Sequence, residues 1–87
     1  MTYTVEWSRR AEKQLAKLDR PVATALVRFM NERVHQAPDP RRIGKQLKAS
    51  DVWRFRVGDY RILCHIKDER LVVLVVELGH RREVYRR

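Results

Sequence analysis

The sequence predicts a single α+β domain, spanning residues 1–87, in which an N-terminal strand and a helical hairpin pack on a mostly antiparallel four-stranded sheet. Apolar residues recur at helical spacing over residues 9–34, and two-residue alternation marks strands within residues 53–78. A chain of 87 residues has room for one core only. A strand, two helices and a run of strands, in the order β-α-α-β-β-β, are typical of an α+β domain.

The N-terminal half begins with a strand and continues as two helices. Residues 3–7 alternate with β-branched side chains, which predicts a short strand. Ser8 then has the chemistry of an N-cap, because its hydroxyl accepts a hydrogen bond from an unpaired helical N–H. Residues 11–18 carry leucine and alanine at helical spacing. Pro21 suits the first turn of a second helix, and Pro38 ends its apolar stripe.

The second half is a basic loop followed by three strands. Residues 38–48 contain two prolines, a glycine and four cations, which predicts an irregular basic loop. Residues 53–57 and 60–66 alternate as strands with one buried face. Residues 71–78 are almost continuously apolar, as in a strand that is buried on both faces. The polar tail, residues 79–87, suits a helical turn.

The charge balance narrows the class of partner. Twenty Lys and Arg residues stand against eleven Asp and Glu, giving a formal net charge of +9. Such an excess on a small domain favours a polyanion: nucleic acid first, an acidic protein second and a membrane surface third. A solvated basic surface with no partner is the alternative.

The sequence also points to a compartment. Cys64 is the single cysteine, so an internal disulfide framework is excluded and a reducing environment is favoured. The N-terminus lacks the apolar region of a signal peptide, and the longest apolar run, residues 71–76, is too short to span a bilayer. We therefore expect a soluble, cytoplasmic protein that does not associate with a membrane.

Arginines are placed where they can meet on one sheet face. Since strand side chains alternate, Arg54 and Arg56 project together, away from the apolar residues between them. If Arg61 points the same way, three guanidiniums converge, with Arg81 and Arg82 at the edge. Guanidinium binds phosphate in a bidentate manner and can stabilise a pentavalent transition state. The alternative is a solvated outer face whose cations prevent aggregation.

Other chemistries find less support in the residues. The three histidines are scattered without metal-ligand spacing, no glycine-rich phosphate loop occurs, and the acidic residues are mostly single. Cys64 shares the parity of Tyr60 and Ile62 and is expected to face the core, which disfavours a nucleophilic thiol. We therefore expect no metal and no cofactor, so any phosphodiester chemistry is expected to be metal-free.

Two segments carry a family resemblance. WRFRVGDYR at residues 53–61 and GHRREVY at 79–85, with the preceding hairpin and KQLK at 45–48, resemble the RelE/ParE toxin superfamily along essentially the whole chain. The resemblance implies a RelE-like fold with the first strand beside the last. It implies the toxin of a type II toxin–antitoxin pair, neutralised by a cognate antitoxin. RelE-like members enter the ribosomal A site and cleave mRNA through its own 2′-hydroxyl, leaving a 2′,3′-cyclic phosphate and a 5′-hydroxyl.

The resemblance also assigns roles by matching positions. Arg61 holds the scissile phosphate, Arg81 acts on the leaving-group side, and Tyr85 stacks on or orients the base at the cut. Arg54 and Arg56 stand where the family has basic strand residues. Further RNA contacts are expected from the basic loop and from the residue after Arg81, namely Lys45, Lys48, Arg41, Arg42 and Arg82.

One departure from the family pattern concerns the general base. Some relatives carry lysines where this chain has Arg54 and Arg56, and a lysine there is thought to take the proton. An arginine practically cannot be deprotonated, so Arg56 is a poor base. Either transition-state electrostatics carry the rate with water as the base, or His80 serves, since its ordinary pKa is near neutrality. The alternative for His80 is a turn residue that ends the strand.

Two other functions compete with the endoribonuclease. A ParE-like inhibitor of DNA gyrase has the same fold and acts through a protein interface, so it does not need convergent phosphate ligands. A non-catalytic RNA-binding domain would tolerate Arg81→Lys with little more than a change in salt dependence.

Overall fold

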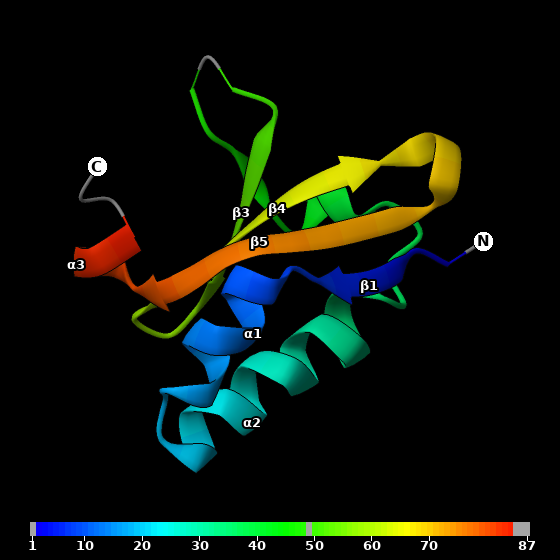
Figure 1. Cartoon of the computed structure of the whole chain (residues 1–87). Helices are drawn as coiled ribbons and strands as arrows, with labels where there is room; N and C mark the ends of the chain where they lie inside the picture. Colours follow the sequence, from blue (N-terminus) through cyan, green and yellow to red (C-terminus); the bar gives the residue numbers. More distant parts are fainter. Residues whose placement is uncertain (1, 49, 85–87) are drawn as a thin grey trace.

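The computed structural model of the protein describes residues 2–48 and 50–84 (Figure 1). The elements follow in this order: β1 (Thr4–Trp7), α1 (Arg9–Ala16), α2 (Arg20–Phe29), a π-helical turn (Met30–Val34), a 3-10 turn (Pro40–Arg42), β2 (Lys45–Gln46), β3 (Val52–Val57), β4 (Tyr60–Lys67), a second 3-10 turn (Asp68–Arg70), β5 (Val72–His80) and α3 (Arg81–Val84). None of the helices in this part of the chain is long and apolar enough to cross a membrane.

The sheet has five strands, in the order β1-β5-β4-β3-β2. The prediction of four strands is therefore wrong in number. Within the predicted basic loop, Lys45 and Gln46 pair with Arg54 and Trp53 to add a short edge strand. Two residues are too few to show alternation, so the sequence pattern could not reveal it. The remaining architecture is confirmed, including the placement of β1 beside β5, which is the one parallel pairing among the described strands.

Helix α1 begins at the predicted cap and extends along the sheet edge. The Ser8 hydroxyl accepts from the Ala11 N–H at 3.1 Å. Strand β1 pairs with β5 only as far as Val75. Beyond that point, the Gln14 side-chain oxygen accepts from the N–H of Leu78 at 2.8 Å. Because this bond satisfies an otherwise open edge donor of β5, α1 continues the edge where β1 stops.

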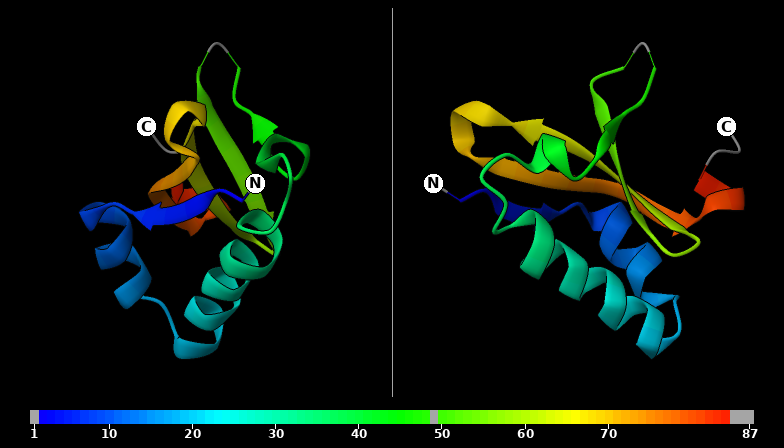
Figure 2. Two further views of the ribbon diagram at one scale, coloured as in Figure 1. Left: turned by 90° about the vertical axis from the view of Figure 1, so that its right-hand side faces the viewer. Right: turned by 180° about the vertical axis from the view of Figure 1, so that it is seen from behind.

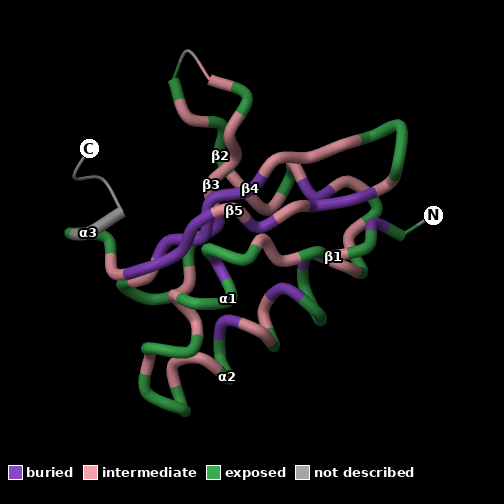
Figure 3. Tube along the Cα trace, viewed as in Figure 1, coloured by how far each residue is buried: buried purple, intermediate pink, exposed green. Residues whose placement is uncertain are grey.

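The hairpin of α1 and α2 covers one face of the sheet and leaves the other without a helical layer (Figures 1 and 2). Buried residues lie where the hairpin faces the sheet (Figure 3). They form one core cluster that includes Leu26, Met30, Phe55, Ile62 and Val75. Phe29 and Phe55 pack with ring centroids 6.3 Å apart. The apolar stripe of α2 is thus ordinary core packing.

Short helical turns follow α2 and β5. Helix α2 ends at Phe29 and continues as one π-helical turn, in which the N–H of His35 donates to the carbonyl of Met30 at 2.8 Å. The predicted helical turn after the last strand is confirmed as α3, within its described residues.

Candidate functional site

The sheet face away from the hairpin, here called the open face, gathers the strand arginines. In the β3–β4 ladder Arg56 pairs directly with Arg61, and Arg54 pairs with Leu63. Lys45 of β2 pairs with Arg54. Directly paired residues project from the same side of a sheet. The prediction that Arg61 points the same way as Arg54 and Arg56 is therefore confirmed, and Lys45 joins them.

Arg61 is the most unusual of these residues because its charge is buried. It is only 6% exposed. Its Nη1 donates to the adjacent Tyr60 carbonyl at 3.4 Å, whereas its Nε has no hydrogen-bond partner among the described residues. No ion pair involves Arg61 in that part of the chain either. A buried guanidinium that forms no ion pair costs free energy, so this position gains from an anion that binds it directly.

The neighbours of Arg61 add positive charge at this end of the sheet. Arg61 pairs directly with Gly79 of β5, which is itself buried and contributes no side chain. Arg56 is exposed beside it. At the same end of the sheet, the N–H of Arg81 donates to the Asp59 carbonyl at 2.8 Å, which ties the start of α3 to the β3–β4 turn. Arg81 is exposed at this position, as is Arg82.

A carboxylate also lies on the open face, and the sequence analysis missed it. Glu77 pairs with Leu63 and is 6% exposed. Its Oε2 lies 3.7 Å from Nη2 of Arg10 on α1. Glu77 is the one charged residue of the apolar run 71–78. That exception was the available signal, because a lone acid in a buried strand marks a position with a special partner.

An irregularity in β5 decides which side chains reach this face. The β4–β5 register shifts between Leu63 and Cys64, so Leu63 pairs with Glu77 and Cys64 with Val75. Val76 is the extra residue of this bulge. A bulge reverses the alternation that follows it, so Glu77 and Gly79 project onto the open face.

The same bulge sends His80 to the hairpin side. His80 pairs with Tyr60, their rings pack edge to face at 5.6 Å, and His80 Nδ1 accepts from the N–H of Arg82 at 3.3 Å. Arg61 lies one residue further along β4 and faces the other way. The structure thus does not bring His80 together with the open-face arginines, and its geometry matches the alternative of a residue that ends the strand.

Arg41 is engaged elsewhere. Its guanidinium donates to both oxygens of Asp68, at 2.9 and 2.7 Å, and lies 5.7 Å above the ring of Trp53. The Arg41 hydrogen bonds hold the pKa of the Asp68 carboxyl below its usual range. The Tyr3 hydroxyl donates a further hydrogen bond to Asp68 Oδ1 at 2.7 Å, which also lowers this pKa. Trp53 faces the hairpin side of β3, so Arg41 is not part of the open face.

The remaining expected RNA contacts are dispersed. Lys45 is exposed on the open face, whereas Arg42 and Lys48 are exposed on the segments before and after β2. Tyr85, expected to act on the base at the cut, lies outside the described residues.

Other reactive groups do not form a second site in the described part of the chain. Cys64 is buried, as predicted, and burial raises the pKa of its thiol well above the ordinary value. No group of three or more His, Cys, Asp or Glu residues gathers there as a metal-binding cluster.

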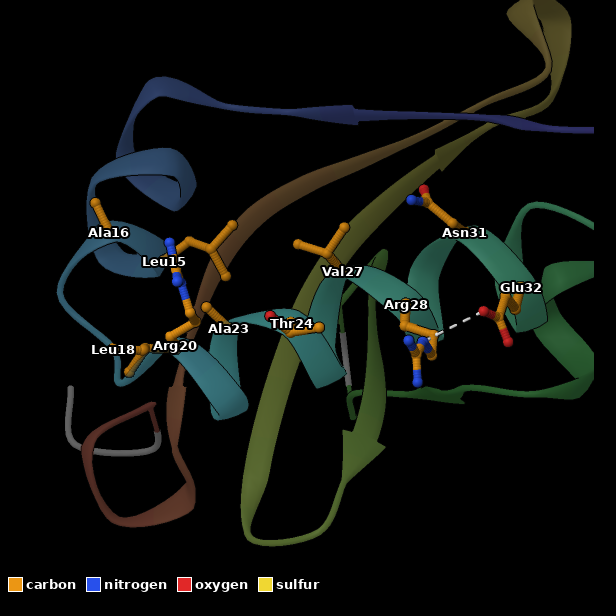
Figure 4. A pocket seen from close by; sticks show the side chains of 10 residues that line it. All are labelled: Leu15, Ala16, Leu18, Arg20, Ala23, Thr24, Val27, Arg28, Asn31 and Glu32. Carbon is orange, nitrogen blue, oxygen red and sulfur yellow. Dashed lines mark ion pairs between the residues drawn. The ribbon is translucent and has the colours of Figure 1, made fainter.

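A groove lies between α1 and α2 on the hairpin side (Figure 4). Leu15, Ala23 and Val27 line it, and an ion pair of 3.4 Å between Arg28 and Glu32 lies at one end. The groove holds none of the open-face arginines and no convergent catalytic groups.

Comparison with known proteins agrees with this geometry. The family model described as the ParE toxin of type II toxin–antitoxin systems (parDE) matches residues 5–85. The chain belongs to this toxin family. It lies within the RelE/ParE superfamily, and it is 35% identical to toxin RelG of Mycobacterium tuberculosis over 89 residues, which cover all of both chains.

Solved structures of RelE toxins share the fold. The RelBE2 toxin–antitoxin complex of M. tuberculosis superimposes with a TM-score of 0.83 and 29% identity over 95% of each chain. A double arginine-to-alanine variant of E. coli RelE in the free state gives a TM-score of 0.77 and 26% identity, covering 98% of this chain and 88% of that one. The α+β, RelE-like fold is therefore confirmed, and the protein is a RelE-like toxin of a type II toxin–antitoxin system.

Proposed function

We propose that this toxin is a ribosome-dependent endoribonuclease that cleaves mRNA in the A site without a metal, and so inhibits translation. The observation that carries the proposal is the Arg56–Arg61 pair on the open face, with Arg61 buried and without an ion pair among the described residues. A phosphodiester placed here supplies the missing negative charge. Arg81, at the same end of the sheet, is available to the leaving group.

The arginines account for the rate through electrostatics. The 2′-hydroxyl loses its proton and its oxygen bonds to the adjacent phosphorus, which adds negative charge to the phosphate oxygens. The bond from phosphorus to the 5′ oxygen then breaks, and that oxygen takes up a proton. The products are a 2′,3′-cyclic phosphate and a 5′-hydroxyl. Guanidiniums fixed in a partly dry site are already in place to stabilise the added charge as it develops, and such electrostatic stabilisation supplies most of the rate enhancement in many enzymes.

The proton route follows from the chemistry of the groups around Arg61. Neither Arg54 nor Arg56 can act as a base at neutral pH. His80 lies on the hairpin side of the sheet. We therefore assign the proton to water, with Arg56 and Arg61 bearing the phosphate charge. Tyr85 keeps its expected role at the base of the cut nucleotide.

The partners belong to the same proposal. Solved relatives of this chain include toxin–antitoxin complexes, such as RelBE2 of M. tuberculosis and the intact E. coli RelBE complex. We propose a cognate antitoxin that is acidic or amphipathic, because a basic face and apolar helix surfaces suit a segment that offers both. In its absence, expression of the toxin should arrest growth.

The test is to map RNA 5′ ends in a reconstituted translation reaction. Wild-type toxin should produce cuts inside codons that are positioned on ribosomes, and Arg61→Ala should remove them. Arg33→Ala is a matched control, because it removes an exposed arginine from the hairpin side. Intact messenger in the wild-type reaction contradicts the proposal.

Inhibition of DNA gyrase is the second candidate, since the matched family model is described as ParE. A gyrase inhibitor acts through a protein interface and has no need of a buried, unneutralised arginine. A DNA supercoiling assay separates the two candidates. Inhibited supercoiling with intact messenger supports the gyrase inhibitor, and the reverse supports the endoribonuclease.

A further inference from the structure

Helix α1 carries a stripe of cations, here called the α1 stripe, that consists of Arg9, Arg10, Lys13 and Lys17. All four are exposed, and together with Gln14 they line a shallow hollow. A spacing of four residues places Arg9, Lys13 and Lys17 above one another on one helix face. Arg10 has the ion pair with Glu77, and no other ion pair of the stripe occurs within residues 2–48 and 50–84.

The α1 stripe continues the open face around the sheet edge. Two contacts fix this orientation: Arg10 reaches Glu77, which projects onto the open face, and Gln14 reaches the backbone of Leu78 at the edge of β5. Leu15 and Leu18 pack against the core on the other side of the helix. The cations therefore point away from the hairpin groove and toward the side of the molecule that bears the open-face arginines.

We infer that the α1 stripe is a second RNA-binding surface, which holds the backbone of a folded, double-stranded RNA while the open face holds a single strand. The inference rests on the proposed function, because it extends the surface assigned to the cut strand. The two cationic surfaces meet around the sheet edge, so one RNA can bind to both at once. Duplex RNA is recognised chiefly through its phosphates and shape, which point charges on a helix can bind without reading sequence.

The composition of the hollow favours RNA over a protein partner. Its lining side chains are all polar or charged, and none of them is acidic. The hot spots of protein interfaces are enriched in Trp and Tyr as well as Arg, and the apolar side chains of α1 pack in the core or in the groove with α2. The stripe offers no apolar side chain.

The test compares binding of two uncleavable RNAs. One is a short hairpin with a single-stranded arm of 2′-deoxy nucleotides, and the other is that arm alone. We expect the wild-type toxin to bind the hairpin RNA at least tenfold more tightly than the arm. The double substitution Lys13→Gln with Lys17→Gln should weaken binding of the hairpin RNA about tenfold. It should also reduce the magnitude of the slope of log affinity against log salt by roughly 1 to 2, because two phosphate contacts are lost. Its affinity for the arm alone should stay within twofold of wild type.

A matched control removes two exposed cations elsewhere: Arg33→Gln with Arg70→Gln should leave both affinities unchanged. If the Lys13/Lys17 variant binds the hairpin RNA as the control does, the inference is wrong. If the hairpin adds no affinity to the wild type and the variant instead loses its cognate antitoxin, the stripe is a protein site and the RNA assignment is overturned. Neither result tests messenger cleavage by the wild type, which is measured in its own assay. The proposed function can therefore stand when this inference fails.

Discussion

Replacing Arg61 by methionine should abolish cleavage and, at the same time, stabilise the fold. The guanidinium is 6% exposed, its Nε has no hydrogen-bond partner among the described residues, and no carboxylate pairs with it there. Methionine keeps the length of the side chain and removes the buried charge. Replacing a whole buried ion pair by apolar residues of similar size is often neutral or stabilising by about 1–4 kcal/mol, and removal of a buried charge that has no ion pair should act in the same direction.

The lower half of that range sets the expected gain, because Arg61 retains 6% exposure and one hydrogen bond, from Nη1 to the Tyr60 carbonyl. We expect a rise of about 1–2 kcal/mol in the free energy of unfolding, measured by urea denaturation. For a domain of this size, the midpoint of thermal unfolding should rise by about 4–8 °C per kcal/mol. Cleavage should fall by about 10²–10³-fold or more, the cost of removing one preorganised charge-stabilising donor.

Arg61→Lys is the matched variant. It retains the charge but cannot bind phosphate in a bidentate manner, so it should cleave better than the methionine variant without becoming more stable. A methionine variant that unfolds more readily than the wild type would show that Arg61 supports the fold, and the reasoning about its unneutralised charge would be wrong.

Four further predictions test the surroundings of this site. His80→Ala should keep messenger cleavage within about threefold of wild type in the same assay, since the ring lies on the hairpin side; a loss as large as that of Arg61→Ala would restore His80 as a catalytic group. Gly44→Ala should destabilise the fold by about 1–3 kcal/mol, measured by thermal unfolding. The reason is that an added Cβ would lie 2.9 Å from Phe55 Cε1 and 3.0 Å from the Arg54 carbonyl oxygen. An unchanged melting temperature would contradict this. Gln14→Ala should cost about 1 kcal/mol by urea denaturation, since the Leu78 N–H loses its acceptor, while Gln14→Glu, which keeps an acceptor, should cost less. The lowered pKa of Asp68 means that its contribution to stability is present above the unfolded carboxyl pKa of about 4 and is lost as the pH falls through the folded value. Asp68→Asn should remove this loss of unfolding free energy at acid pH. If the unfolding free energies of the variant and the wild type depend on pH in the same way, Asp68 makes no such contribution.

Local patterns in the sequence were sufficient for most of the fold. The Ser8 cap, the apolar stripe of α2 and the alternation of β3 and β4 each depend on residues close in sequence, and each was found where it was predicted. The convergence of Arg54, Arg56 and Arg61 was also predictable, because a tight turn at Gly58 fixes the register of the two strands it joins.

What the sequence could not supply depends on pairing between distant segments. The bulge at Val76 reverses the faces of the following residues, and the apolar run 71–78 does not fix its position, although Glu77 is the one charged residue there. Glu77 and His80 therefore reach the faces opposite to those that strict alternation from Val75 gives them. Arg41 was predicted to contact RNA because it lies in a basic segment of the sequence. In the structure its guanidinium instead binds Asp68, which is 27 residues further along the chain and could not be recognised as its partner from the sequence.

The chemical nature of the RNA ends tests the central claim most directly. A defined messenger, labelled on both sides of the cut and treated with the toxin on ribosomes, should yield a 3′ fragment with a free 5′-hydroxyl and a 5′ fragment ending in a 2′,3′-cyclic phosphate, because arginines stabilise internal attack by the 2′-hydroxyl. A 5′-phosphate on the downstream fragment would mean that water attacks the phosphorus instead, and would contradict the mechanism built on Arg56, Arg61 and Arg81.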